Sequence, residues 1–117
     1  MADLGETDAL FESLGYLAAI IDDRAAGDAP DEPSWTRKLL DKGPAQCAKK
    51  LGEEGVEAAL AVASQSDADV AAEAADLIYH LFVALRSRGV ALDDVGAALA
   101  QRQGVSGVAE KAGRKSD

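Results

Sequence analysis

Residues 71–85 constrain the fold more than any other stretch of the chain. This segment, AAEAADLIYHLFVAL, is apolar on nearly every side of a helical wheel, which is typical of a buried helix. The chain around it is rich in alanine, with 25 of 117 residues, and poor in β-branched residues. Because that composition favours helix over sheet, we expect an all-α fold and exclude a sheet protein.

Apolar spacing, capping residues and glycines predict a bundle of about five helices. The expected helices run from Thr7 or Asp8 to about Ala26, from Ser34 to the Gly43-Pro44 pair, from about Ala45 to Ser64, from about Asp67 to Ser87, and from Leu92 or Asp93 to about Gln103. The third and fourth are separated by only a few residues, so they should form a central antiparallel hairpin. We expect one domain over residues 1–103, a four-helix-bundle-like core completed by dimerisation, and a flexible or substrate-ordered tail over 104–117.

The charge and the rare residues exclude several classes of protein. A formal net charge of −9 argues against binding to nucleic acid or to an anionic membrane, both of which need a basic surface. No run of about 18 apolar residues is present, and the amino terminus lacks the basic start and apolar run of a signal peptide. The single Cys47 and single His80 cannot build a zinc site. We therefore expect a cytoplasmic protein.

Basic residues are concentrated in one segment of this acidic chain. Residues 33–65 carry five basic and four acidic residues, whereas residues 1–32 carry nine acidic residues and one basic residue, Arg24. A net positive segment in an acidic protein is where an anionic ligand is expected. The alternative is a solvated basic face.

Two pairs of carboxylates lie on the predicted hairpin. Glu54 and Glu57 share one face of the third helix at spacing i, i+3, and Glu73 and Asp76 share one stripe of the fourth at the same spacing. Buried carboxylates that face each other are costly without a cation, and all-oxygen ligation favours Mg²⁺ or Mn²⁺ over zinc. The pattern predicts a divalent-metal phosphate site. We expect the other side of the third helix to be apolar, with Leu51, Ala58, Ala59, Val62 and Ala63.

The same charges allow other interpretations. The glutamates of the third helix form an exposed acidic face relieved by Lys49 and Lys50 if no cation binds. Lys50 either reaches a phosphate or forms an i, i+4 ion pair with Glu54. The spacing lacks the twelve-residue loop of an EF-hand, and one histidine cannot supply the di-iron motif. We expect His80 to pack or to support a ligand rather than to catalyse.

Longer motifs resemble one enzyme family. KKLGEEGVE over residues 49–57 and EAADLIYH over residues 73–80 are similar to phosphoribosyl-ATP pyrophosphatases. That family belongs to the all-α MazG-like nucleotide pyrophosphohydrolases, whose shared signature is EExxE followed by ExxD. The Ser34-Trp35-Thr36 stretch and the tail over residues 104–114 also resemble the family, although Trp35 stands in place of the more usual tyrosine.

The resemblance implies an activity and a set of partners. A homodimer would use Mg²⁺, or Mn²⁺ in its place, to hydrolyse the α–β phosphoanhydride of phosphoribosyl-ATP. The products would be phosphoribosyl-AMP and pyrophosphate, in the second step of histidine biosynthesis. One rival is a MazG-like or dUTP-type house-cleaning pyrophosphatase, and another is a non-catalytic acidic helical module that binds a protein.

Together with the helix spacing, the implied reaction gives candidate roles to individual residues. The metal ligands would be Glu54, Glu57, Glu73 and Asp76. Glu53 would be a further ligand, a general base or the partner of a basic residue. Trp35 is either a core residue or a ring that stacks on adenine. The residues expected to bind substrate are Lys50, Lys38, Arg37, Trp35 and Arg24.

Overall fold

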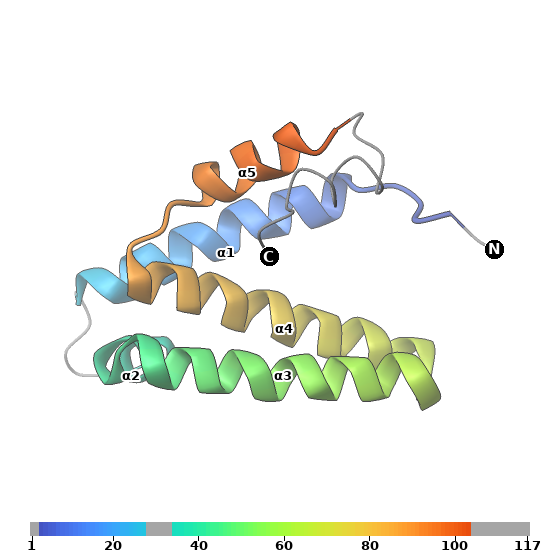
Figure 1. Ribbon diagram of the computed structural model, residues 1–117, viewed down its shortest axis with the longest axis horizontal. Helices are drawn as coiled ribbons and strands as arrows, with labels where there is room; N and C mark the ends of the chain where they lie inside the picture. The colour runs from blue at the N-terminus through green and yellow to red at the C-terminus, as the bar shows by residue number, and fades with distance from the viewer. Residues whose placement is uncertain (1–2, 28–33, 104–117) are drawn as a thin grey trace, which may run out of the picture.

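The computed structural model describes residues 3–27 and 34–103, and this part of the chain is all-α, as predicted (Figure 1). It contains α1 (Asp8–Ala26), α2 (Trp35–Lys42), α3 (Pro44–Ser64), α4 (Asp67–Arg88) and α5 (Leu92–Gln101), and no strand. The predicted loop over residues 28–33 and the predicted tail over 104–117 lie outside the described residues.

The ends of the helices follow local capping chemistry. The backbone N–H of Arg37 donates to Ser34 Oγ at 2.9 Å, and that of Asp69 donates to Ser66 Oγ at 3.2 Å. These bonds satisfy backbone donors that the first turn of a helix leaves without a partner. α3 begins at Pro44, one residue earlier than predicted. Proline is well suited to the first position of a helix, because a backbone N–H there would have no partner within the helix.

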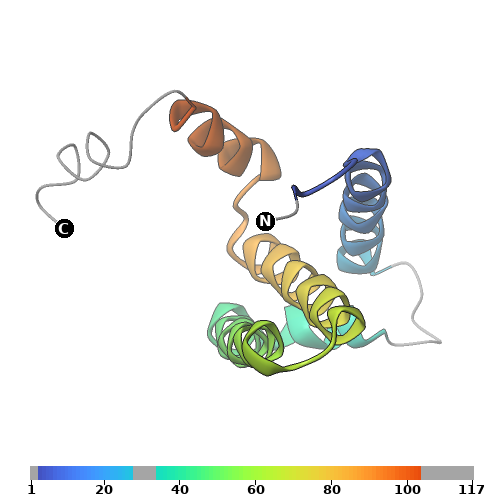
Figure 2. The same cartoon turned by 90° about the vertical axis from the view of Figure 1, so that its right-hand side faces the viewer.

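α3 and α4 form the antiparallel hairpin that the sequence predicts (Figures 1 and 2). α1 and α2 pack against one part of it. The core there takes one buried side chain from each of four helices: Ile21, Leu39, Cys47 and Val83. Cys47 and Val83 come from the beginning of α3 and the second half of α4. In the other half of the hairpin, Ala61 is the one fully buried residue among those described.

Two contacts hold α2 in place on this core. The hydroxyl groups of Thr36 and Tyr79 form a hydrogen bond that joins α2 to α4. The Cys47 thiol donates to the Leu39 carbonyl oxygen at 3.2 Å, which joins α3 to α2. Cys47 is thus a small buried side chain of the core.

The predicted apolar side of α3 is wrong in part. Val62 is 71% exposed, and Ala59 and Ala63 are also exposed. The buried residues of α3 are Cys47 and Ala61, which lie on the same side of the helix as Glu54. An alanine-rich helix has no bulky stripe that selects one face, so small residues on the glutamate side allow the close approach of α4.

α4 is less covered within one protomer than its sequence suggests. His80 and Val83 are its buried residues, while Leu81 is exposed and Phe82 is half-buried. None of the described helices combines the length and the apolar character needed to cross a membrane. Completion of the bundle by dimerisation stays a prediction.

Candidate active site

The hairpin brings together three of the four carboxylates that were predicted to bind metal. One carboxylate oxygen from each of Glu54, Glu57 and Glu73 lies within 4.8 Å of the other two. Glu54 and Glu73 are half-buried between the helices, and Glu57 is exposed. The i, i+3 spacing puts both α3 glutamates on the side that faces α4, and the short connection sets them opposite Glu73.

Asp76, the fourth predicted ligand, lies outside this group of three and is exposed. Its charge nevertheless acts on the cluster. Burial raises the pKa of Glu73 above its usual value, and the carboxylates of Glu57, Asp76 and Glu54 raise it further. The site therefore holds more negative charge than the protein around it neutralises.

Two oxygen atoms in the cluster lack a partner. Glu54 Oε2 and Glu73 Oε2 are buried, and neither accepts a hydrogen bond from any residue that the structure describes. A buried carboxylate oxygen without a donor is costly, and a hard divalent cation would satisfy both oxygens at once. A donor set made only of carboxylate oxygens is of the kind that Mg²⁺ or Mn²⁺ prefers, and the cofactor stays a prediction.

Of the two roles expected for Lys50, the structure does not show the ion pair with Glu54. Its ammonium lies 3.2 Å from a carboxylate oxygen of Glu53, at spacing i, i+3. The Glu54 side chain is turned toward α4, whereas that of Glu53 lies on the solvent side, where the flexible lysine reaches it. Of the three roles open to Glu53, the structure shows the pairing with a basic residue.

Two of the predicted substrate-binding residues, Arg37 of α2 and Arg24 of α1, pair with acidic residues outside the carboxylate cluster. Arg37 pairs with Asp41 at 3.0 Å and donates to the Ala25 carbonyl oxygen at 2.9 Å, so it ties α2 to the end of α1. Arg24 pairs with Asp23 at 3.1 Å.

The other two predicted substrate contacts, Lys38 and Trp35, are exposed on α2. Trp35 is 51% exposed, which excludes the interpretation that it is a core residue of the protomer. Its ring is accessible to a ligand, whereas the neighbouring Thr36 is buried and bonded to Tyr79.

His80 is buried on the same stripe of α4 as Glu73. Its Nδ1 atom lies 2.9 Å from the Asp76 carbonyl oxygen, and because a carbonyl only accepts, Nδ1 carries the hydrogen. The Nε2 atom is buried and without a hydrogen-bond partner among the described residues. The predicted packing role of His80 agrees with this placement. The sequence did not predict the hydrogen bond from His80 Nδ1 to the Asp76 carbonyl oxygen. Every helical residue has a carbonyl group four positions before it, so residue type does not indicate which side chain bonds to it.

A helical hairpin with carboxylates facing each other from both helices defines the class of protein. It is an all-α, MazG-like nucleotide pyrophosphohydrolase fold. Within this class, the chain belongs to the phosphoribosyl-ATP pyrophosphohydrolase family, whose model matches residues 14–103. The match includes the whole hairpin and confirms the resemblance seen in the sequence.

Individual relatives agree with the family model. The chain is 56% identical over 103 residues to a phosphoribosyl-ATP pyrophosphatase of Nitrobacter winogradskyi, covering 86% of this chain and 85% of the relative. It is 52% identical over 105 residues to phosphoribosyl-ATP pyrophosphatase 1 of Rhodopseudomonas palustris, covering 90% and 96%. It is 54% identical over 98 residues to a phosphoribosyl-ATP pyrophosphatase of Ruegeria pomeroyi, covering 84% and 91%.

Proposed function

We propose that this chain hydrolyses the α–β phosphoanhydride of phosphoribosyl-ATP in a Mg²⁺-dependent reaction. The products are phosphoribosyl-AMP and pyrophosphate, as in the second step of histidine biosynthesis. The observation that carries the proposal is the group of three carboxylate oxygens, from Glu54, Glu57 and Glu73, that lie within 4.8 Å of one another. Glu54 and Glu73 each have a buried oxygen that accepts no hydrogen bond from the described residues. The relatives named above support the choice of substrate.

Glu54, Glu57 and Glu73 are the residues that would hold the ion. When bound there, Mg²⁺ would neutralise charge on a triphosphate and would lower the pKa of a water molecule that attacks it. Asp76 lies about one turn beyond Glu73 on the same stripe of α4 and is exposed, so its side chain is free to join the other three. The paired positions on two packed helices fix the separation of the carboxylates.

Lys50 is the basic residue best placed to meet a phosphate. It lies about one turn before Glu54, and its ammonium is held by Glu53 at the solvent side of α3. An exposed ion pair of this kind contributes little to stability, so a phosphate group can replace Glu53 as the partner of Lys50 at small cost. Glu53 then keeps the lysine extended near the site before substrate arrives.

The rival functions make different predictions in one assay. Pyrophosphate release is measured from phosphoribosyl-ATP and from a panel of nucleoside triphosphates that includes dUTP, with and without Mg²⁺. The proposal expects release from phosphoribosyl-ATP with Mg²⁺ and little from the others. Preference for dUTP or another triphosphate would favour a house-cleaning pyrophosphatase, and no release from any substrate would favour a non-catalytic acidic module.

Matched variants make that assay specific to the site. Glu57→Gln removes one charged oxygen from the cluster, while Glu12→Gln makes the same chemical change on an exposed residue of α1. Loss of pyrophosphate release in the first variant and retention in the second would assign the activity to the cluster.

The proposal extends to assembly and location. We infer a cytoplasmic homodimer that binds a nucleotide and does not bind nucleic acid or membranes. The apolar residues that one protomer leaves exposed support assembly, and the net charge of −9 opposes binding to nucleic acid.

A further inference from the structure

Helix α2 presents one aromatic and two basic side chains on a single side. Trp35, Lys38 and Lys42 recur at spacings of three and four residues, so they form one stripe along the helix. All three are exposed. The buried residues of the helix, Thr36 and Leu39, lie on the adjacent side that faces the core. The α2 stripe therefore offers a ring and two ammonium groups to a ligand.

The lysines of the α2 stripe have no acidic partner. Neither Lys38 nor Lys42 forms an ion pair with a residue that the structure describes. The one acidic residue of α2, Asp41, is held by Arg37 at 3.0 Å. Like charges four residues apart on a helix repel each other. In a chain with 21 acidic and 12 basic residues, this pair makes a local positive surface that is suited to an anion.

Contacts on the other sides of α2 hold the stripe in place. The Thr36 hydroxyl is bonded to the Tyr79 hydroxyl of α4. Arg37 donates to the Ala25 carbonyl oxygen at the end of α1, at 2.9 Å. Because Arg37 lies nearly opposite Trp35 on the helical wheel, the stripe faces away from the end of α1. A helix that is already fixed loses less conformational freedom when its side chains bind a ligand.

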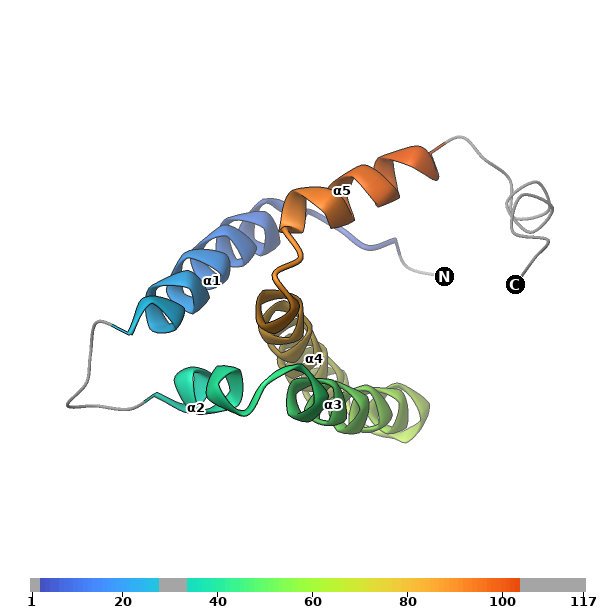
Figure 3. The same cartoon turned by 60° about the vertical axis from the view of Figure 1, so that its left-hand side comes forward.

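The contact with Tyr79 also brings the start of the stripe near the carboxylates. Tyr79 lies three residues after Asp76 and six after Glu73, which corresponds to about 4.5 Å and about 9 Å along the α4 axis. Helix α2 packs against both helices of the hairpin (Figure 3). A nucleotide that places its triphosphate at the carboxylates can therefore reach α2 with its other end.

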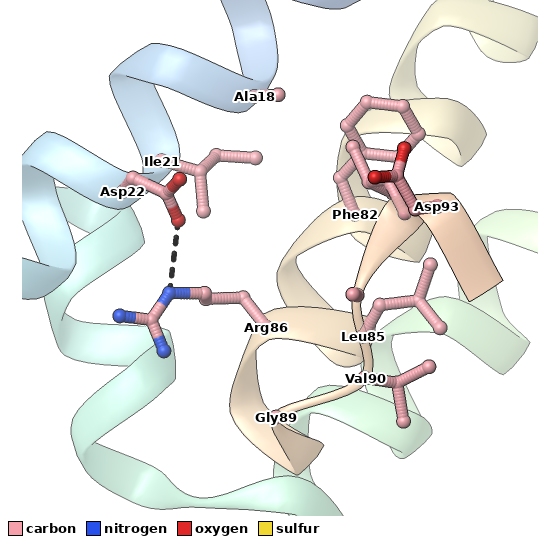
Figure 4. A pocket seen from close by; sticks show the side chains of 11 residues that line it. Ala18, Ile21, Asp22, Phe82, Leu85, Arg86, Gly89, Val90 and Asp93 are labelled. Atoms are coloured by element: carbon pink, nitrogen blue, oxygen red, sulfur yellow. Dashed lines mark hydrogen bonds and ion pairs between the residues drawn. The ribbon is translucent and has the colours of Figure 1, made fainter. Parts of the chain in front are cut away.

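The cavity of the protomer is less suited to an anion. This cavity, of about 430 Å³, lies between α1, the second half of α4 and the turn into α5, and its charged residues are Asp22, Arg86 and Asp93 (Figure 4). Arg86 is paired with Asp22 at 3.0 Å, and Asp93 adds a further negative charge. A phosphate group there would meet net negative charge. The α2 stripe is the better anion site.

We propose that the α2 stripe binds the phosphoribosyl-adenine end of the substrate. The Trp35 ring stacks on the base, and the ammonium groups of Lys38 and Lys42 bind the 5′-phosphate of the phosphoribosyl group. Because ATP lacks this group, the stripe selects phosphoribosyl-ATP over ATP. The proposal rests on the proposed function and names the part of the substrate that each side chain recognises.

A binding test needs neither metal nor turnover. Trp35 is the one tryptophan of the chain, so quenching of tryptophan fluorescence reports a ligand that stacks on its ring. The ligands are phosphoribosyl-AMP, which is the reaction product, and AMP, which lacks the phosphoribosyl group. The wild type should bind phosphoribosyl-AMP at least tenfold more tightly than AMP. Lys38→Gln should raise the Kd for phosphoribosyl-AMP about tenfold and that for AMP less than twofold.

Lys49→Gln is the matched control, because it removes the same charge from an exposed lysine of α3. It should leave both dissociation constants within twofold of the wild type, and circular dichroism should show the same helix content in all three proteins. In turnover of phosphoribosyl-ATP, Lys38→Gln should raise KM with little change in kcat. The reason is that its phosphate is remote from the bond that breaks, so the contact is the same in the ground state and the transition state.

Several results would overturn the subsite. They are equal losses of the two ligands in Lys38→Gln, equal effects of Lys38→Gln and Lys49→Gln, and a fluorescence that responds to protein dilution but to neither ligand. The last result would assign the ring to a subunit contact. Pyrophosphate release from phosphoribosyl-ATP is measured separately. Release without a preference for phosphoribosyl-AMP overturns the subsite alone, whereas the preference without release supports the subsite and overturns the hydrolysis.

Discussion

Binding of Mg²⁺ should stabilise the folded chain, and Glu57→Gln should weaken that effect without disturbing the fold. Glu57 supplies one of the three carboxylate oxygens that lie within 4.8 Å of one another. It is also the exposed member of the group, so the change to glutamine removes a charge and leaves the packing between α3 and α4 intact. The variant therefore separates the role of the charge from the role of the side chain in the hairpin.

The size of the effect follows from mass action. A ligand that binds only the folded state at 100 times its dissociation constant adds about 2.7 kcal/mol to the free energy of unfolding. For a chain of this length, that corresponds to a rise of roughly 10 °C in melting temperature. If loss of one charged oxygen weakens Mg²⁺ binding by about tenfold, the same concentration adds only about 1.4 kcal/mol, or roughly 5 °C.

Thermal melts followed by circular dichroism, with Mg²⁺ titrated into metal-free buffer, measure both values. Glu12→Gln is the control, because it makes the same chemical change on α1 and should respond to Mg²⁺ like the wild type. The reasoning would be refuted by a wild-type melting temperature that neither Mg²⁺ nor Mn²⁺ changes. It would equally be refuted if the two glutamine variants shifted by the same amount.

Three further predictions test the catalytic, electrostatic and packing parts of the structure. Glu57→Gln and Asp76→Asn should each abolish pyrophosphate release from phosphoribosyl-ATP while the far-ultraviolet circular dichroism stays that of the wild type; near wild-type turnover in either variant would remove that residue from the ligand set. Since the pKa of Glu73 is raised in the folded state, the native chain binds more protons than the unfolded chain, so this residue lowers stability as pH rises above about 4.5. Urea denaturation of metal-free protein should show that decline in the wild type and a smaller one in Glu73→Gln; parallel pH profiles would contradict it. Leu39→Ala should cost about 2–5 kcal/mol of unfolding free energy, because Leu39 is fully buried where four helices meet, and a loss below about 1 kcal/mol in urea melts would show that α2 does not support the core.

Features set by short-range chemistry were predictable from the sequence. Ser34 and Ser66 accept hydrogen bonds from backbone N–H groups three residues ahead, so the beginnings of α2 and α4 follow from residue type alone. Gly27 and Gly89 end α1 and α4 in the left-handed conformation that glycine adopts without strain. The hairpin followed from the short connection between its helices, and the glutamate cluster followed from the hairpin.

Features set by long-range packing were not predictable. Residue type alone does not indicate that the hydroxyl groups of Tyr79 and Thr36 form a hydrogen bond. It also does not indicate that Arg37, expected to bind a phosphate, donates to the carbonyl oxygen of Ala25. The packed face of α3 was misassigned for a related reason. Most apolar residues of α3 are alanines, so burial of one face of the helix gains about as much free energy as burial of another. Which face becomes buried then depends on how α4 packs against α3.

The hairpin separates the part that stabilises the fold from the part that carries unpaired charge. Ile21, Leu39, Cys47 and Val83 join four helices around the beginning of α3 and the second half of α4. The carboxylate cluster lies farther along the hairpin, toward the turn that connects the two helices, where the packing depends on small residues such as Ala61. The two buried carboxylate oxygens without donors lie outside the core, so their desolvation cost does not add to a loss of core packing. The same oxygens placed among the core residues would destabilise the fold in both ways. Substitutions that neutralise the cluster should therefore change ligand binding and raise the stability of the metal-free protein, whereas substitutions in the core should unfold the site and the scaffold together.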